Sequence, residues 1–283
     1  MTDSLIEAIH SAQRGERRPL VMGIVNVTPD SFSDGGRFDR PDRALAHALR
    51  LVEEGVDILD VGGESTRPGA EPVGVDEELE RVIPVIERIR GRVDVPISID
   101  TVKPEVMRRA VAAGATMIND VLGLRAEGAM AAAAELQVPV CIMHMQGEPR
   151  TMQKEPRYID VVEDIRSFFG ERLQACREAG VDDSLLVLDP GFGFGKTLEH
   201  NLQLLARFDH LRGLGRPLLA GISRKSMLGA LTGKSDPGQR VAASVAAAVL
   251  AAGRGAAIVR LHDVDETVDA LKIFAAVEHD HRG

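Results

Sequence analysis

The sequence predicts an α/β fold, a single (β/α)8 (TIM) barrel with long loops after its first and second strands. Eight short runs rich in branched apolar residues alternate with longer segments of helical periodicity, which is the pattern of repeated βα units. The chain has 283 residues, close to the roughly 250 typical of this barrel. Most runs are continuously apolar, as expected for parallel strands covered on both faces.

The expected strands follow one another along the whole chain. They are residues 20–27, 57–63, 96–101, 117–121, 139–145, 185–191, 217–223 and 256–262. The helical patterns between them have apolar residues three and four positions apart. They cover roughly 45–55, 79–89, 104–113, 128–136, 158–179, 198–211, 239–253 and 265–277, and a further helix begins near Ser226. Pro84 should kink the second of these helices or displace its start.

The domain organisation follows from these elements. Residues 1–19 precede the first strand and are predicted to be an N-terminal extension that packs on the outside or frays. Residues 20–283 form the barrel domain, because no linker or low-complexity segment divides them.

Composition excludes several classes of partner. With 34 Lys and Arg against 43 Asp and Glu, the net charge of −9 argues against nucleic acid or an anionic membrane. No apolar run approaches the ~18 residues of a membrane span. The two cysteines, Cys141 and Cys176, cannot form a disulfide framework, and the N-terminus lacks the features of a signal peptide. We therefore expect a cytoplasmic protein.

Polar residues follow nearly every apolar run. They are Asn26, Glu64, Asp100, Asn119, Asp120, His144, Asp189, Ser223, Arg260 and His262. In a parallel barrel these strand ends share one rim, where the active site of such enzymes lies. Helix capping and turn formation are the alternative for any one position, but polar termination of almost the whole set favours a site.

Two glycine-containing segments do not fit common motifs. PGFGFGKT has Pro190 where a Walker A loop needs glycine, and it lacks the third glycine of a dinucleotide fingerprint. GISRK lacks the last glycine of a nucleophile elbow, so Ser223 is not predicted to be an acyl-transfer nucleophile. The glycines instead predict a backbone loop that approaches a ligand closely.

Eight motifs together resemble those of bacterial dihydropteroate synthases. In order they are MGIVNVTPDSFSDGG, DVGGESTRPGA, SIDT, IND, MHMQG, DPGFGFGK, SRKS and RLHDV, and the resemblance runs from about Leu20 to about Val277. It implies a transferase of folate biosynthesis that condenses 6-hydroxymethyl-7,8-dihydropterin pyrophosphate with p-aminobenzoate. It also implies a TIM barrel, Mg²⁺, a target of sulfonamides and a homodimer, although the Ala-rich helix after Gln239 could equally pack within the chain. The sequence does not tell how sensitive this chain is to sulfonamides.

The pterin edge presents amino, ring N–H and carbonyl groups. Ionised Asp100 and Asp189 only accept hydrogen bonds, while the Asn119 amide both donates and accepts, so the three can match such an edge. The resemblance assigns pterin binding to these residues and also to Lys225, Met143 and Gly221. As alternatives, Asp100 could cap a helix, Asp189 could form a turn and Asn119 could bond to backbone.

The leaving diphosphate requires cations. Arg67, Arg260 and His262 stand at strand ends, and arginine binds phosphate with two hydrogen bonds; for Arg260 the alternative is a surface salt bridge. The resemblance adds Thr66 and Asn26, with Asn26 as the one protein ligand of Mg²⁺, which often keeps water and takes phosphate oxygens.

The p-aminobenzoate site is assigned largely by the resemblance. Phe194 is implied as its wall, and Arg67 and Pro68 as further contacts. Ser226 begins a helix whose free N–H groups suit a carboxylate, and Lys225 could reach either that carboxylate or the pterin.

The chemistry is hypothesised to be a dissociative substitution, in which the C–O bond breaks before the neutral amine attacks. The residues expected to act are Asp100, Lys225, Arg260 and, in the first loop, Asp30 or Asp34, between which the sequence does not choose. The long loops 27–36 and 65–73 are expected to close and exclude water from the pterin cation.

Two other functions share part of this pattern. A methyltetrahydrofolate-binding methyltransferase would keep the pterin carboxylates but not the diphosphate cluster. A non-catalytic pterin-binding paralogue should show eroded loop or cationic residues, whereas here every motif position has the expected chemical type.

Overall fold

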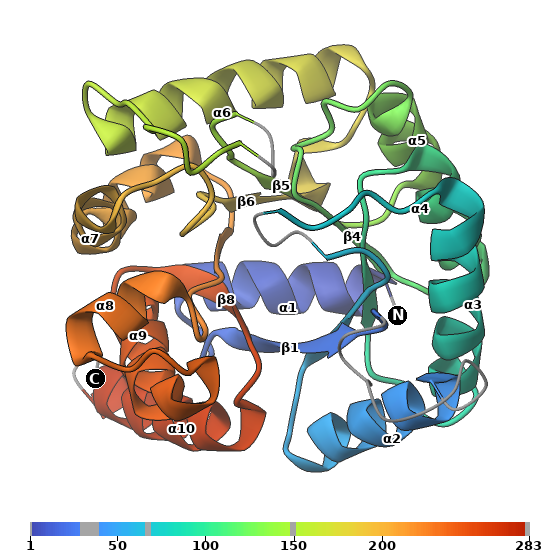
Figure 1. Cartoon of the computed structure of the whole chain (residues 1–283), viewed down its shortest axis with the longest axis horizontal. Helices are drawn as coiled ribbons and strands as arrows, with labels where there is room; N and C mark the ends of the chain where they lie inside the picture. The colour runs from blue at the N-terminus through green and yellow to red at the C-terminus, as the bar shows by residue number, and fades with distance from the viewer. Residues whose placement is uncertain (1, 29–39, 66–68, 148–150, 281–283) are drawn as a thin grey trace.

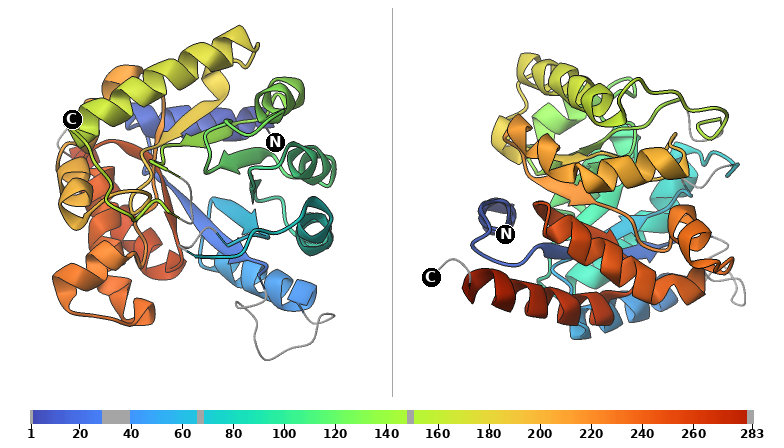
Figure 2. Two further views of the ribbon diagram at one scale, coloured as in Figure 1. Left: turned by 45° about the horizontal axis from the view of Figure 1, so that its top comes forward. Right: turned by 90° about the vertical axis from the view of Figure 1, so that its left-hand side faces the viewer.

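The structure, a computed structural model, describes residues 2–28, 40–65, 69–147 and 151–280. Eight strands form a closed barrel in sequence order, and every neighbouring pair is parallel (Figure 1). Helices cover its outer surface (Figure 2). The predicted (β/α)8 fold is therefore confirmed.

All eight expected strands form, but most are shorter than their apolar runs. They are β1 Leu20–Asn26, β2 Ile58–Gly62, β3 Ile97–Asp100, β4 Met117–Asp120, β5 Val140–Met143, β6 Leu186–Asp189, β7 Leu218–Ala220 and β8 Ala256–Leu261. Residues such as Thr101, His144 and Pro190, expected within strands, lie just beyond their carboxyl ends. They leave the sheet because this end of the barrel turns into the loops of its mouth.

The helices also follow the expected periodicity. They are α1 Thr2–Arg14, α2 Arg40–Glu53, α3 Val75–Arg90, α4 Pro104–Ala112, α5 Ala129–Leu136, α6 Val161–Glu178, α7 Leu198–Ala206, α8 Ser226–Thr232, α9 Val241–Ala252 and α10 Val264–Asp280. In the described ranges the short 3₁₀ segments are η2 Asp183–Leu185, η3 Phe208–Leu214 and η4 Pro237–Arg240. The segments expected as helices 198–211 and 239–253 are thus each part α and part 3₁₀.

Pro84 does not displace the start of its helix, so that alternative is wrong. Helix α3 begins at Val75 and continues past Pro84 to Arg90. Its first turn carries Asp76, Glu77 and Glu78, and acidic side chains stabilise a helix N-terminus.

The lower part of the barrel interior is apolar and is covered by α1. Alternate strand residues, among them Leu20, Ile58 and Cys141, form one buried cluster with Leu5 and Ile9 of α1. Leu5, Ile9 and Ala12 recur at helical spacing, which gives α1 one apolar face. Figure 2 (right) shows this helix across one end of the barrel. The open end is therefore the carboxyl-terminal one.

Three connections at that open end are long. Residues 27–39 separate β1 from α2 and residues 63–74 separate β2 from α3, as expected, but residues 144–160 between β5 and α6 form a longer connection that the sequence did not single out. Within the described ranges, none of the helices combines the length and the apolar character needed to cross a membrane.

Candidate active site

Side chains of the upper interior layer converge at the open end of the barrel. Asp100 of β3 is the register partner of Asn119 in β4, and Met143 of β5 is the partner of Asp189 in β6. Residues in register on parallel strands face the same side. Every second side chain of these strands points into the barrel. The inward residues near the start of most of these strands are apolar and form the barrel floor, and these four inward residues lie at the mouth.

Arg260 of β8 links two acidic residues across the barrel. Its Nε donates to Asp60 Oδ2 at 2.6 Å and its Nη2 to Asp100 Oδ2 at 2.7 Å. Asn119 Nδ2 donates to the same Asp60 oxygen at 3.2 Å. Asp60 is fully buried and Asp100 nearly so. The surface salt bridge considered for Arg260 is therefore wrong, because its ion pairs lie inside the barrel.

Burial makes the acidic side of this site unusual. It raises the pKa of the Asp100 carboxyl to about 7, against the opposing attraction of Arg260, and Asp60 raises that pKa further. Burial also raises the pKa of Asp189, although the charge of Lys225 lowers it. Two acids with raised pKa values at one end of the barrel mark a candidate functional centre.

The alternative roles of the pterin-site candidates are partly resolved. The N-cap of α4 is Lys103, so Asp100 does not cap that helix. Asn119 bonds to the Asp60 side chain rather than to backbone. Asp189 does form a turn, because its Oδ1 accepts from the Gly191 N–H at 2.8 Å. The other carboxylate oxygen, Oδ2, lies near Gly221 at the end of β7.

Lys225 lies against the loop that follows β6. Its Nζ donates to the Phe192 carbonyl and lies 4.4 Å from the centre of the half-buried Phe194 ring, a cation–π distance. Burial lowers the pKa of Lys225 to about 8, while Asp189 opposes that shift. Lys225 is also the N-cap residue of α8, so Ser226 begins the helix as expected.

His262 is held by Ser223 across the ends of β7 and β8. The backbone N–H of His262 donates to Ser223 Oγ at 3.2 Å, and that hydroxyl lies 3.0 Å from His262 Nδ1. A hydroxyl that donates to Nδ1 leaves the ring hydrogen on Nε2. Ser223 thus orients a histidine that can donate to an anion.

Sequence reasoning missed Asp60 and Lys196. Asp60 lies in the apolar run of β2, two residues after Ile58, so its side chain points to the same face as that of Ile58. An acid on the inward face of an apolar strand was the signal in the sequence that could have identified it. Lys196, at the end of the DPGFGFGK motif, is almost fully buried. Its Nζ contacts the Gly191 carbonyl and His144 Nδ1 at 2.9 and 3.0 Å.

A second buried ion cluster lies beside the mouth. Lys103 pairs with Glu64, two residues after the end of β2, and with the fully buried Glu78 of α3. Glu64 also accepts from the Val73 N–H at 3.1 Å. These contacts hold together the two ends of the β2–α3 connection.

Five of the expected site residues lie outside the described part of the chain. They are Asp30, Asp34, Thr66, Arg67 and Pro68. Asn26 ends β1 at the mouth and is partly exposed. Its amide oxygen fits a hard cation such as Mg²⁺ as a single ligand. No group of three or more His, Cys, Asp or Glu side chains suited to a metal occurs in the described ranges.

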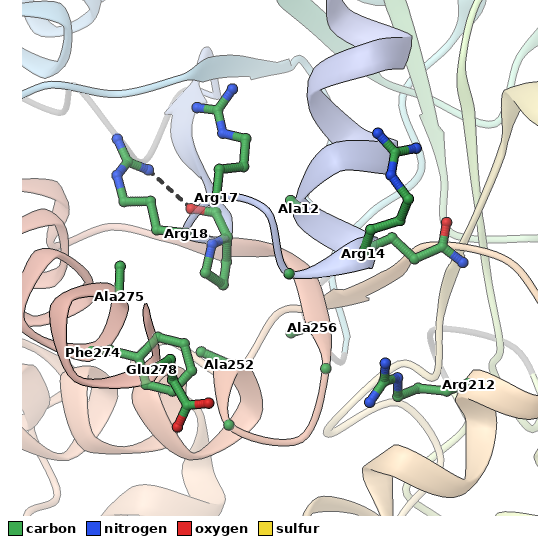
Figure 3. Close-up of a pocket in the computed structure, with 15 residues that line it drawn as sticks. Ala12, Arg14, Arg17, Arg18, Arg212, Ala252, Ala256, Phe274, Ala275 and Glu278 are labelled. Atoms are coloured by element: carbon green, nitrogen blue, oxygen red, sulfur yellow. Dashed lines mark hydrogen bonds between the residues drawn. The ribbon is translucent and has the colours of Figure 1, made fainter. Parts of the chain in front are cut away.

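A separate pocket lies at the opposite end of the barrel, beside α1 and α10 (Figure 3). Its empty volume is about 580 Å³. Arg17 and Arg18 line it but pair with Asp57, and Arg14 pairs with two glutamates. The perturbed acids and the buried cations lie at the mouth instead, and the mouth is the candidate active site.

Comparisons with known proteins identify the family of the chain. The family model described as "Pterin binding enzyme" matches residues 22–262. Dihydropteroate synthase of Escherichia coli K12 is 53% identical over 258 residues, 91% of either chain. The chain belongs to the dihydropteroate synthase family of pterin-binding enzymes. The Bacillus subtilis member is 44% identical over 94% of this chain and 91% of its own.

Solved structures of the family share the fold. Dihydropteroate synthase of Xanthomonas albilineans with 4-aminobenzoic acid has a TM-score of 0.88 and 59% identity, covering 92% of this chain and 93% of its own. The same organism's enzyme in complex with 7,8-dihydropteroate has a TM-score of 0.85 and 56% identity, over 92% of this chain and 94% of that one. The predicted family and enzyme class, a transferase of a non-methyl alkyl group, are confirmed.

Proposed function

We propose that this chain condenses 6-hydroxymethyl-7,8-dihydropterin pyrophosphate with p-aminobenzoate, releasing pyrophosphate and forming 7,8-dihydropteroate. The observation that carries the proposal is the meeting of Asp100, Asn119 and Asp189 with Arg260 at one barrel mouth. Relatives solved with 4-aminobenzoic acid and with 7,8-dihydropteroate support the same substrates.

The pterin lies among the acids in this proposal. Asp100 and Asp189 accept from its amino and ring N–H groups, and Asn119 supplies an amide. Met143 packs on the ring face and the absence of a side chain at Gly221 leaves room for its edge. Each unmatched polar group in such a buried pocket would cost about 1–3 kcal/mol, so the match selects a pterin.

The diphosphate lies toward the cationic side of the mouth. Arg260 and His262 donate to it, together with Thr66 and Arg67. Asn26 is the proposed protein ligand of Mg²⁺, which when bound would neutralise charge on the diphosphate. Arg260 pairs with Asp60 and Asp100 and also donates to the diphosphate in this proposal. It therefore couples binding of the pterin ring to binding of the diphosphate.

p-Aminobenzoate is proposed to lie between Phe194 and the start of α8. The Phe194 ring packs against its aromatic ring, and Pro68, outside the described residues, is a further proposed contact. Its carboxylate meets Ser226, Lys225 and Arg67. Lys225 lies against the Phe194 ring, which supports its proposed contact with both substrates.

The reaction is proposed to be dissociative. p-Aminobenzoate is already a neutral amine at pH 7, so departure of pyrophosphate is the difficult step. The dihydropterin ring donates electrons to the methylene carbon as the C–O bond breaks, and the cation is then attacked by the amine nitrogen, which loses its proton. A carboxylate near the methylene, Asp30 or Asp34, stabilises the cation.

Product formation tests the function directly. Enzyme, pterin pyrophosphate, p-aminobenzoate and Mg²⁺ should yield 7,8-dihydropteroate by chromatography, and chelation by EDTA should stop the reaction. Methyl transfer from methyltetrahydrofolate to a corrinoid, or pterin binding without turnover, would replace this function by one of the alternatives.

The order of the steps has its own readout. Without p-aminobenzoate, the dissociative route still releases pyrophosphate, measurable with a coupled phosphate assay. A strict requirement for the amine before any pyrophosphate appears would contradict that order.

We further propose a cytoplasmic homodimer. Both cysteines are buried free thiols, which suits a reducing compartment. Leu250 of α9 and Ile273 and Val277 of α10 are exposed large apolar side chains on adjacent helices. The Ala face of α9 packs inside the chain through Ala247 and the alanines around it. The proposed dimer surface is the outer face of these two helices, and their exposed apolar side chains support it.

Charges on this surface should separate the protomers. Leu250→Glu combined with Ile273→Glu is expected to convert the dimer to a monomer, because each buried carboxylate lacks a partner. Light scattering after size exclusion gives the mass, and Ile159→Glu, at an exposed site before α6, is the control. A parent chain that is monomeric at micromolar concentration would refute the dimer.

A further inference from the structure

The loop between β6 and α7 lies directly on the backbone of the connection that follows β5. Gly191 and Gly195 have positive φ values of 68° and 60°. A Cβ at Gly191 would lie 2.0 Å from the His144 carbonyl oxygen, and one at Gly195 would lie 2.5 Å from that of Gln146. The glycines are required because two backbones meet there without side chains between them.

Side chains, rather than a strand ladder, anchor this loop. The five carbonyls from Gly191 to Gly195 all accept hydrogen bonds from side chains, whose donors are Lys196, Lys225, Gln153, Lys196 again and Tyr158 in that order. Buried carbonyls of irregular backbone need such partners. One residue, Lys196, supplies two of the five.

Lys196 ties the start of the loop to Phe194. Its Nζ donates to Gly191 O at 2.9 Å and to Phe194 O at 3.0 Å. The Phe194 N–H also donates to Gly191 O, at 3.1 Å, which closes a tight turn between the two residues. The lysine side chain, 3% exposed, is therefore an internal brace of the turn that presents the Phe194 ring.

His144 completes the coordination of the amine. Its Nδ1 lies 3.0 Å from Lys196 Nζ, and burial lowers the pKa of the imidazole to about 2, so the ring is neutral at pH 7. An ammonium can donate to all three neighbours, and a neutral amine can donate to both carbonyls and accept from Nδ1–H. Both protonation states satisfy the brace, so its geometry does not depend on the charge of Lys196.

We propose that Lys196, assisted by Tyr158, is a positioning residue that fixes Phe194 as the wall of the p-aminobenzoate subsite. The inference rests on the proposed function, in which Phe194 lines that subsite. Lys196 lies behind the turn and acts through Phe194. Its loss should therefore weaken capture of the amine substrate while leaving the pterin acceptors in place, because Asp100, Asn119 and Asp189 lie on β3, β4 and β6, before the braced turn.

The kinetic pattern of Lys196→Met tests this role. The variant keeps the aliphatic stem but removes the donors. The KM for p-aminobenzoate should rise about tenfold, equivalent to about 1.4 kcal/mol, with kcat changed less than about threefold. The dissociation constant for 6-hydroxymethylpterin, measured by calorimetry, should stay within about twofold. Arg166→Met, on the exposed face of α6, is the matched control.

A double-mutant cycle shows whether Lys196 acts through Phe194. In a Phe194→Ala background, Lys196→Met should change the KM for p-aminobenzoate by less than about twofold, because the wall it positions is gone. Tyr158→Phe removes the donor to Gly195 O and should raise the same KM about threefold. If Lys196→Met does not fold, the KM of Tyr158→Phe for p-aminobenzoate tests the proposal instead.

The outcomes separate this inference from the proposed function. A parent enzyme that makes no dihydropteroate would refute the function. A productive parent whose KM for p-aminobenzoate is unchanged by Lys196→Met, or by Tyr158→Phe where the first variant is unfolded, would overturn the inference. Equal losses of pterin binding and amine capture would also overturn it, because they indicate a general structural role.

Discussion

Replacing Arg260 by Met should abolish activity and destabilise the fold. We expect kcat/KM to fall about a thousandfold or more, because the variant loses a diphosphate donor and the counter-charge of the pterin acids. The free energy of unfolding should fall by about 3–5 kcal/mol, since removing one partner of a buried ion pair leaves an uncompensated charge. Here two carboxylates, Asp60 and Asp100, lose the same partner.

A second substitution separates the two effects. In Asp60→Asn/Arg260→Met, one of the stranded charges is removed, so urea denaturation should show most of the stability recovered while steady-state activity stays lost. Arg166→Met, which breaks an exposed pair with Glu163, should change stability by less than about 1 kcal/mol. If Arg260→Met had the same free energy of unfolding as the parent, Arg260 would not be the charge that compensates the buried carboxylates.

Gly191→Ala should be the most disruptive change of a single methyl group at the mouth. The residue has φ 68°, and its Cβ would lie 2.0 Å from a backbone oxygen that cannot move without displacing the end of β5. Steric overlap with backbone adds to the conformational cost of positive φ, and we expect a loss of about 3–5 kcal/mol in the free energy of unfolding.

The matched control has the same backbone conformation without the collision. Gly215 has φ 70° and no atom within 4 Å of the position of its Cβ. Gly215→Ala should cost about 1–2 kcal/mol, the price of the left-handed conformation alone. Urea midpoints of the two variants measure the difference. Equal losses would mean that the loops separate at little cost and are not held backbone to backbone.

Much of this protein could be predicted from the order of its residues. In a strand every second side chain points to the same face. This rule predicts that the side chains of Asp100, Asn119, Asp189 and Arg260 point into the barrel, and parallel strands bring their carboxyl ends to one rim. These rules are local, so they hold whatever the neighbouring elements do. The same local rules predicted the eight strands. The residue at which each strand ends depends on where the backbone leaves the barrel sheet.

Partners across the barrel could be assigned only once it had closed. Arg260 and Asp60 are 200 positions apart, and nothing local in β8 specifies which acid its side chain meets. Lys196 likewise looks like an ordinary loop lysine until the β5 and β6 ends lie together and bury it beside His144. Long-range pairing depends on strand register and barrel closure. The sequence by itself therefore determined the kinds of groups at the mouth, and the tertiary structure decided which of them neutralise, brace and orient one another.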